Sequence, residues 1–370
     1  MKILIVGGVA GGASCAARAR RLSEDAEIIL IDRGPYVSFA NCGSPYYVGN
    51  VIQDEQNLLV ATPELFKSRF NIEVRLENEV TRIDRDKQTV EIKELKTGRL
   101  YEESYDALVL SPGASPIKPP LPGIEREGIF VLRTIPDSRK IKKWIQEKNV
   151  KSAVIVGGGF IGLEMVSTLH SHLKSQGVSL LLGQHGGIRV NDQIKTSDDH
   201  IWAVGDAVES RDFITGEWIT VPLAGPGNRQ GRVAADTIFN RPSHFRGIQG
   251  TAVCKVFDLV ASLTGANEKT LKRLNNPHQK VYLYPGHHAG YYPNAKPIEM
   301  KVLFSPTDGK ILGAQAVGEE GAEKSIDAIA ALIQKSGTVY DLEEAELCYV
   351  PQFGAAKDPV NMAGMLAPTP

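Results

Sequence analysis

The sequence predicts an α/β protein, and three observations carry that prediction. Glycine-rich turns at residues 7–12 and 157–162 each follow a short apolar run and precede a helical stretch, which is how a nucleotide-binding βαβ unit begins. Past residue 250, apolar and polar residues alternate in Ile298–Phe304 and Ile311–Val317, a pattern typical of antiparallel strands. A helix over Glu323–Gln334 is expected to cover that sheet. With 370 residues, the chain is long enough for about two or three domains.

The N-terminal unit is expected to bind a dinucleotide. Lys2–Val6 is suited to a strand buried on both faces, Ala13–Leu22 to a helix, and Glu27–Ile31 to a second strand that ends at Asp32. Glycines let the backbone approach a pyrophosphate, the helix N-terminus stabilises its charge, and the acidic residue binds the ribose hydroxyls. The residues expected to hold this ligand are Gly7, Gly8, Val9, Ala10, Gly12 and Asp32.

One position in this first glycine turn (residues 7–12) departs from the G-x-G-x-x-G pattern. Val9 stands where the second glycine would be, while Gly7 and Gly12 occupy the first and third places. The alternative interpretation is a tight turn between a strand and a helix that binds no ligand. The succession of strand, turn, helix, second strand and acidic residue favours the dinucleotide.

Composition argues against several functional classes. Hydrophobic residues make up 42% and charged residues 23% of the chain, as in ordinary globular proteins, and the net charge of −1 argues against a nucleic-acid or anionic-membrane surface. Lys2–Val6 is too short, and too soon followed by glycines, for a signal peptide, and no other stretch approaches a membrane span. The cysteines lie far apart in the sequence, so neither a metal site nor a disulfide framework is expected, and the location is expected to be cytoplasmic.

Cys42 is the residue most indicative of chemistry. It lies in the segment Ser38–Gly49, here called the thiol loop, a short way past the first glycine turn. A dithiol reductase would have a second cysteine a few positions on, but Tyr46 and Tyr47 occupy that space. We therefore expect any disulfide at Cys42 to form with a partner outside the loop. The alternative is a small buried cysteine in a turn.

Two later segments indicate which dinucleotide is bound. Tyr105–Ala114 is predicted to be a strand and a tight turn containing Ser111 and Gly113. A second apolar strand ends at Gly205 and Asp206, whose carboxylate can accept a hydrogen bond from a ribityl hydroxyl. Together with the thiol loop, these segments resemble the FAD-dependent pyridine nucleotide-disulfide oxidoreductases. The thiol loop by itself resembles the coenzyme A-disulfide reductase and NADH oxidase branch of that family.

The resemblance implies roles for residues along the whole chain. It implies an FAD cofactor, Cys42 as the single redox-active thiol, and Ser38 and Asn41 as residues that serve the thiol chemistry. The segments around Tyr291 and Tyr349 resemble the dimerisation domain of the branch, in which two tyrosines from the partner subunit lie over the thiol. Without the resemblance, each tyrosine would be interpreted as a core aromatic with a satisfied hydroxyl.

The coenzyme A interpretation requires basic residues for phosphates. The resemblance implies that Ser14, Arg18 and Arg21 bind the nucleotide end of coenzyme A, and Lys357 lies in the C-terminal motif. The alternative for the two arginines is that they complement the dipole at the end of a helix and stay solvated.

The second glycine turn contains Gly157, Gly159 and Gly162 and is followed by Glu164. In the family it opens the NAD(P)H domain, yet here only about 40 residues separate Gly162 from Gly205, against ~30 or more for one βαβ unit alone. The chain is therefore predicted to be shortened in this domain, after Met165 and after Gln184. The shortening argues against NAD(P)H binding, which the family would otherwise imply.

These observations predict three domains. An FAD-binding Rossmann-like domain comprises residues 1–113 and 190–245, a truncated NAD(P)H-binding domain is inserted at 150–189, and an α+β dimerisation domain covers 250–370. The predicted function is reduction of coenzyme A disulfide, or of a related persulfide or disulfide, with NAD(P)H in a cytoplasmic homodimer. The alternatives are an NADH oxidase that uses oxygen and a flavin-binding protein without turnover.

Overall fold

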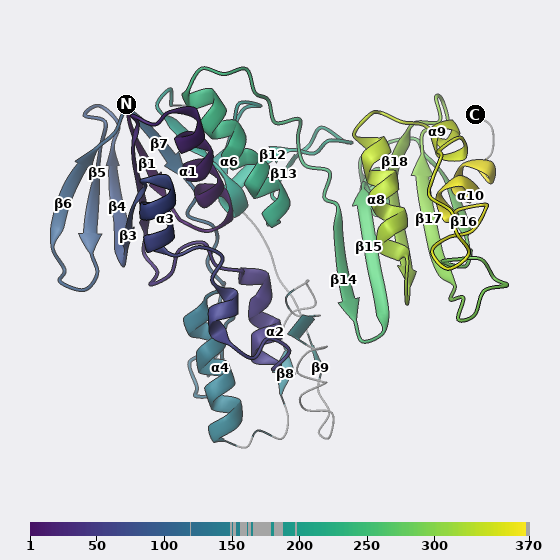
Figure 1. The fold of residues 1–370 in the computed structure, drawn as a ribbon, viewed down its shortest axis with the longest axis horizontal. Helices are drawn as coiled ribbons and strands as arrows, with labels where there is room; N and C mark the ends of the chain where they lie inside the picture. The colour runs from purple at the N-terminus through teal and green to yellow at the C-terminus, as the bar shows by residue number, and fades with distance from the viewer. Residues whose placement is uncertain are drawn as a thin grey trace. The chain divides into compact units, whose positions relative to one another are not determined.

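The computed structural model describes residues 1–118, 120–148, 150, 153–155, 161, 164–165, 179–180, 188–196 and 198–367 (Figure 1). The chain forms two compact units, and each is described by itself. The first unit comprises Met1–Gly157, Thr168–Arg211 and Trp218–Ile248. The second comprises Gly158–Ser167, Asp212–Glu217 and Gln249–Pro370.

A parallel sheet forms the centre of the first unit. Its strands lie in the order β11 (Ile201–Ala203), β7 (Ala107–Leu110), β1 (Lys2–Val6), β2 (Glu27–Asp32) and β3 (Glu73–Leu76). Every neighbouring pair is parallel. The middle residues of β1 and β2 are buried on both faces, by helices on one face and by Val90 and Ile92 of an antiparallel sheet on the other, and such strands are apolar throughout. The two strands predicted from the N-terminal apolar runs are confirmed.

Helices α1 (Ala10–Leu22) and α6 (Ala224–Ile238) pack tightly together in this unit. A Cβ on Gly231 would lie 2.2 Å from the carbonyl oxygen of Gly11, so the backbones meet where neither helix has a side chain. The expected start of α1 at Ala13 is wrong by three residues. The turn ends earlier, since Gly11 and Gly12 are part of the helix, and the Gly11 backbone makes this close approach.

The first unit contains further helices and strands, which are labelled in Figure 1 where there is room. Its helices and short 3₁₀ segments are η1 (Asn41–Gly43), α2 (Ser44–Val48), η2 (Glu55–Leu58), α3 (Pro63–Phe70), α4 (Ile135–Glu147) and η3 (Gly205–Ala207). An antiparallel sheet contains β4 (Asn78–Asp84), β5 (Thr89–Glu94) and β6 (Leu100–Ser104). Short strands form the remaining pairs: β8 (Val154–Ile155) with β9 (Ser179–Leu180), and β12 (Val208–Arg211) with β10 (Ile188–Arg189) and β13 (Trp218–Ile219).

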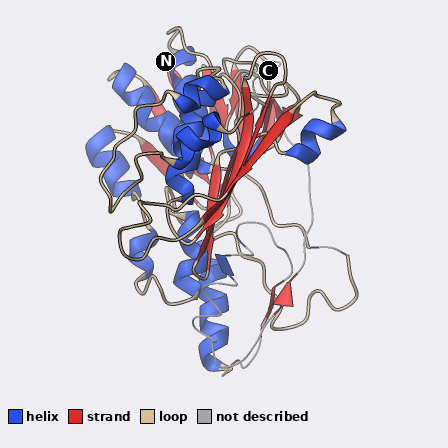
Figure 2. Ribbon diagram, turned by 90° about the vertical axis from the view of Figure 1, so that its right-hand side faces the viewer, coloured by secondary structure: helices blue, strands red, loops and turns tan. Residues whose placement is uncertain are grey.

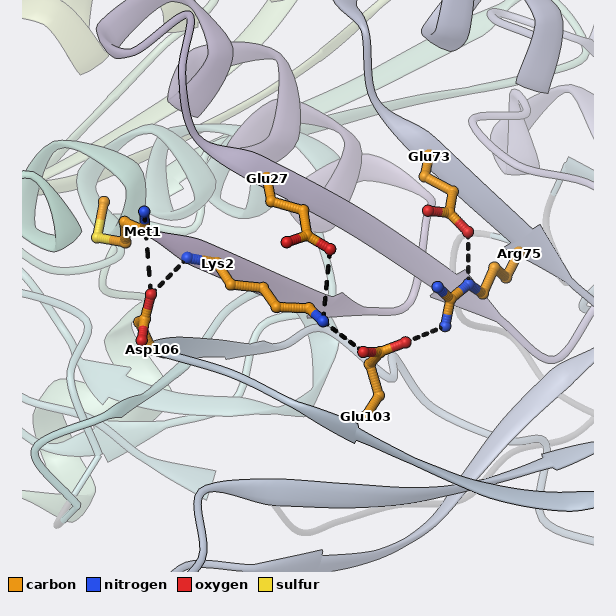
Figure 3. A network of polar contacts seen from close by, with 7 residues as sticks. All are labelled: Met1, Lys2, Glu27, Glu73, Arg75, Glu103 and Asp106. Atoms are coloured by element: carbon orange, nitrogen blue, oxygen red, sulfur yellow. Dashed lines mark hydrogen bonds and ion pairs between the residues drawn. The ribbon is translucent and has the colours of Figure 1, made fainter.

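Glu103 on β6 links the two sheets through charge (Figure 3). Its carboxylate accepts from the Lys2 ammonium and, at 2.5 Å, from the Arg75 guanidinium. Lys2 also lies 3.4 Å from Glu27, and Arg75 lies 2.7 Å from Glu73. Burial alone would raise the pKa of Glu103, but the bonds from Lys2 and Arg75 outweigh it and lower that pKa.

Replacing Glu103 by glutamine is expected to lower the free energy of unfolding by about 1–3 kcal/mol, because it removes a largely buried partner of two cations. A depressed carboxylate pKa stabilises the fold above the unfolded-state pKa, and that stability is lost as the pH falls through the folded-state pKa. Urea unfolding across the acid range should therefore show a pH-dependent contribution in the parent that Glu103→Gln lacks. The matched control Glu102→Gln, on the exposed side of β6, should change stability by less than ~0.5 kcal/mol. Equal effects of the two substitutions would contradict the prediction.

The second unit is built on a five-stranded antiparallel sheet with the order β14-β15-β18-β17-β16 (red in Figure 2). The strands are β14 (Ala252–Val256), β15 (Leu259–Gly265), β16 (Gln279–Leu283), β17 (Ile298–Phe304) and β18 (Ile311–Gly318). Helix α8 (Ala322–Ile333) packs on β15 and β18, and the shorter helices are α7 (Glu268–Arg273), α9 (Val339–Glu343) and α10 (Pro359–Met365). The predicted strands and the covering helix are confirmed, with ends that differ by at most one residue.

Candidate functional site

The first glycine turn connects β1 to α1 and leaves no room for a side chain at Gly7 or Gly12. Gly7 has a left-handed conformation (φ +94°), and a Cβ on it would lie 1.9 Å from the carbonyl oxygen of Ser111. A Cβ on Gly12 would lie 1.9 Å from the carbonyl oxygen of Gly7. Val9 is the N-cap of α1 and Ala10 its first residue, so the absent second glycine does not interrupt the turn. Such a bare turn lets phosphates approach the N–H groups at the start of a helix of 13 residues.

Asp32 ends β2 beside this turn. Its Oδ2 accepts from the N–H of Gly8 at 2.8 Å, and its Oδ1 accepts from the N–H of Gly34 at 2.7 Å. Burial raises the pKa of Asp32, while the two backbone hydrogen bonds act in the opposite direction. A carboxylate has about four lone-pair sites, so Asp32 keeps acceptor capacity for ribose hydroxyls.

Two more loops lie at the carboxyl edge of the parallel sheet. Ser111 follows β7, and its Oγ accepts from the N–H of Gly12 at 3.1 Å. Gly113 and Gly205 turn the chain in the left-handed region (φ +68° and +80°), and the N–H of Gly205 donates to Gln230 at 2.8 Å. The strand order reverses direction between β1 and β7, which is where open α/β sheets bind ligands. The predicted loops are thus brought together with the first glycine turn.

Arg133 is a residue of this edge that sequence reasoning missed. Its guanidinium lies 3.3 Å from the Asp206 carboxylate and donates to the carbonyl of Ala114 at 2.9 Å. With its amide oriented to satisfy both groups, Asn41 donates to the Arg133 carbonyl at 2.7 Å and accepts from the same guanidinium. Arg133 therefore joins the loops after β7 and β11 to the residue that precedes Cys42.

A local signal in the sequence would have pointed to Arg133. The next residue, Thr134, is the N-cap of α4 and forms a capping box with Asp137. Thr-x-x-Asp before a helix fixes the direction from which the chain enters, and so the position of the preceding side chain.

The thiol loop is held against the first glycine turn. Cys42 lies in η1 and is exposed, so the alternative of a buried cysteine is wrong. The N–H of Ser38 donates to the carbonyl of Gly8 at 2.7 Å. The carbonyl of Ser38 accepts from Val60 at 2.8 Å and Ala61 at 3.1 Å, and these bonds hold Ser38 in a left-handed conformation (φ +48°). A partly exposed thiol on an anchored loop is the setting of reactive cysteines.

Helix α4 supports the thiol loop from its other side. Ile135 packs in a buried cluster with Tyr47 of α2. The Arg139 guanidinium donates to Glu55 at 2.5 and 2.9 Å and thereby lowers the pKa of that carboxylate. The Lys142 ammonium lies 3.9 Å from the centre of the Tyr47 ring. The loop is therefore rigidly held on both sides, which pre-organises its thiol.

The polar residues predicted on α1 contact α6. The Ser14 hydroxyl donates to Asn228 at 2.9 Å, and the Arg18 guanidinium donates to Asp236 at 2.7 Å. Arg18 is half-buried in this ion pair, so the alternative of a solvated arginine is wrong for it. Arg21 is exposed.

In the second unit, the two predicted tyrosines lie together. The hydroxyls of Tyr291 and Tyr349 are 2.7 Å apart, and this hydrogen bond raises the pKa of Tyr291. Their exposed fractions are 77% and 49%, so neither is a core aromatic. Lys357 is exposed and lies one residue before Asp358, the N-cap of α10.

The second glycine turn is only partly within the described residues. Strand β8 pairs in parallel with β9, as expected for the start of a βαβ unit. Gly157, Gly159 and Gly162 lie outside the described residues. Glu164 is half-buried; burial raises the pKa of Cys254, and the Glu164 charge acts in the same direction.

The described part of the chain contains no helix long and apolar enough to cross a bilayer. Within the same residues, no three histidine, cysteine or acidic side chains are grouped so that they could hold a metal ion.

Comparison with known proteins gives consistent matches over most of the chain. A profile of pyridine nucleotide-disulphide oxidoreductases matches residues 1–181, and the dimerisation domain of the same oxidoreductases matches residues 251–358. A coenzyme A disulfide reductase of Staphylococcus epidermidis is 31% identical over 440 aligned positions, which cover 99% of this chain and 99% of that protein. The alignment is longer than the 370 residues of this chain, so the relative has internal residues that this chain lacks, as the predicted shortening requires.

Two solved structures are similar to the whole chain. The structure of reduced Bacillus anthracis CoADR-RHD has a TM-score of 0.94 and 43% identity, and the match covers 98% of this chain and 79% of that one. An NAD-dependent persulfide reductase from A. fulgidus has a TM-score of 0.93 and 30% identity, with coverages of 99% and 83%.

Proposed function

The chain belongs to the pyridine nucleotide-disulphide oxidoreductase family, and we propose that it reduces coenzyme A disulfide, or a related persulfide or disulfide, with NAD(P)H through Cys42. The observation that carries this proposal is the position of the exposed Cys42 on a loop bonded to the first glycine turn through Ser38 and to Arg133 through Asn41. A dinucleotide site and one accessible thiol are thus parts of one rigid arrangement. Similarity to the coenzyme A disulfide reductase and persulfide reductase supports the choice of substrate.

The residues present fit FAD. Gly7 and Gly12 provide a turn in which any Cβ would collide with backbone, and Asp32 keeps acceptor capacity beside it. We assign FAD binding to Gly7, Gly8, Val9, Ala10, Gly12, Asp32, Ser111, Gly113, Gly205 and Asp206. When bound, FAD supplies the two electrons, taken as hydride from NAD(P)H, that return Cys42 to the thiolate.

The chain's own residues carry out the thiol chemistry. The Cys42 thiolate attacks one sulfur of the substrate disulfide, so that a Cys42–substrate disulfide forms and the other half leaves as a thiolate. Two-electron reduction of this new disulfide would then release the second half as a thiol and return Cys42 to the thiolate. Asn41 keeps its place next to Cys42 through the Arg133 bonds. Tyr291 and Tyr349 of a partner subunit supply the proton for the leaving thiolate. A tyrosine phenol is protonated at neutral pH in any case, and the hydrogen bond between the two hydroxyls, which raises the pKa of Tyr291, holds them together.

The same proposal covers the substrate, the partner subunit and the location. Ser14, Arg18, Arg21 and Lys357 bind coenzyme A phosphates, and Ser38 and Asn41 position the thiol loop. The match to the dimerisation domain supports a homodimer, and the widely spaced cysteines support a cytoplasmic location. Gly157, Gly159, Gly162 and Glu164 are assigned to the NAD(P)H turn.

The test is anaerobic oxidation of NADH and of NADPH by the FAD-loaded protein, with coenzyme A disulfide or glutathione disulfide as acceptor. We expect oxidation with coenzyme A disulfide and little with glutathione disulfide, because only the former has a nucleotide for the α1 residues. If NADH is oxidised only after oxygen is admitted, and neither disulfide acts as acceptor, the protein is instead an NADH oxidase. No oxidation with any acceptor would identify a flavin-binding protein without turnover, the consequence expected if the shortening has removed the NAD(P)H site.

A further inference from the structure

A pocket of about 220 Å³ lies between the second half of α6 and the segment that follows it. Its walls on α6 include Arg229, Arg232 and Asp236, and the opposite wall is Ser243–Arg246. We call it the arginine pocket. None of these residues belongs to the motifs assigned above.

The pocket concentrates positive charge. Arg229, Arg232 and Arg246 bring three guanidinium groups to it, and they come from two different elements. The acidic residue in the lining of the pocket is Asp236, and its carboxylate already forms an ion pair with Arg18 at 2.7 Å. Within the described part of the chain, neither Arg229 nor Arg232 has a carboxylate at ion-pair distance. Arg229 and Arg232 therefore bring positive charge to the pocket that no carboxylate of the described residues pairs with.

The arginines are held together although they repel one another. Burial lowers the pKa of Arg229, and the positive charge of Arg246 lowers it further. Phe245 is buried and supports the position of Arg229, whose guanidinium lies 5.2 Å from the centre of the Phe245 ring. The backbone N–H of Phe245 donates to the carbonyl of Asp192 at 2.6 Å. An anion between the guanidinium groups would relieve the repulsion.

The size of the pocket limits the ligand. A volume of about 220 Å³ is below the ~300 Å³ at which sites for drug-sized ligands begin, and it is enough for a phosphate group. An arginine guanidinium can pair with two oxygens of a carboxylate or of a phosphate, but a phosphate monoester has three terminal oxygens and a charge of about −1.5 to −2, which suits several guanidinium groups better than a single carboxylate does.

We propose that the arginine pocket binds a phosphate monoester and that its source is the 3′-phosphate of coenzyme A, the second part resting on the function proposed above. Asp236 connects the pocket to Arg18, which is assigned to the nucleotide end of the same ligand. The ligand would thus be held by α1 along its nucleotide and by α6 at its terminal phosphate.

The test compares coenzyme A, dephospho-coenzyme A and inorganic phosphate as ligands in calorimetric titrations of the FAD-loaded full chain, with Cys42→Ser present throughout to prevent a covalent disulfide. Coenzyme A is expected to bind about 10- to 100-fold more tightly than the dephospho form, as hydrogen bonds to a charged group allow. Arg232→Gln should remove most of that difference. The matched control Arg241→Gln, an exposed arginine that is not part of the lining, should keep it.

The other outcomes separate the two proposals. If neither form of coenzyme A binds but inorganic phosphate binds the parent and not Arg232→Gln, the pocket is a phosphate site and the proposed function fails. If both forms of coenzyme A bind equally in the parent and phosphate does not bind, the inference about the pocket is overturned while the proposed function stands. If no ligand binds, both are overturned.

Discussion

Replacing Cys42 by serine is expected to reduce the rate of coenzyme A disulfide reduction by at least ~10³-fold while FAD stays bound. A serine hydroxyl is not ionised at neutral pH and cannot form the disulfide through which electrons reach the substrate. Cys42 is the cysteine of the thiol loop, and the FAD residues assigned above do not include it. Steady-state rates and the visible absorbance of the purified variant measure the two parts of the prediction separately.

Cys348→Ser is the matched control, because Cys348 is the other exposed cysteine of the described residues. It is expected to retain the parent rate. A Cys42→Ser variant that works at the parent rate would show that electrons reach the disulfide without this thiol, and the single-thiol mechanism would be wrong.

Gly7→Ala is expected to abolish FAD binding and to destabilise the fold by more than ~3 kcal/mol. The new Cβ would lie 1.9 Å from the carbonyl oxygen of Ser111, and both atoms belong to backbone segments held by neighbouring strands. The measurement is FAD absorbance per mole of protein after purification with excess FAD, together with thermal unfolding.

The control variant Gly98→Ala distinguishes the effect of a steric collision from the strain of placing alanine in a left-handed backbone conformation. Gly98 also has a left-handed conformation (φ +75°), but nothing lies within 4 Å of the position its Cβ would take. That control is expected to cost only ~1 kcal/mol and to keep its flavin. A Gly7→Ala variant with parent FAD content would contradict the assignment of the first glycine turn.

Much of the fold could be predicted because its signals are local. The apolar run of β1 and the alternation of β17 each occupy consecutive residues, and the structure confirms both. The start of α1 was wrong because its first turn contains Gly11 and Gly12, which are poor helix formers in isolation. A Cβ on Gly12 would lie 1.9 Å from the carbonyl oxygen of Gly7, and one on Gly11 would lie 2.8 Å from Val204, a residue that is remote in sequence.

The candidate site could be predicted only where a residue type indicates its own chemistry. Cys42 and Asp32 are of that kind. The capping box after Arg133 could have indicated where this residue lies, but its role could not be predicted, because that role comes from contacts with Asp206 and Asn41, which are remote in sequence. The arginine pocket likewise forms only because the segment after α6 folds back onto that helix. No pattern of residue spacing in the sequence predicts this contact.

The most direct test of the account is an anaerobic titration of the FAD-loaded protein with NADH and then with NADPH, followed through the visible flavin absorbance. The account predicts that one of the two nucleotides bleaches the flavin near stoichiometry, and that coenzyme A disulfide then restores the absorbance. If neither nucleotide bleaches a flavin that dithionite reduces normally, the chain has kept its flavin and its thiol but has no electron donor, and the proposed reductase activity is contradicted.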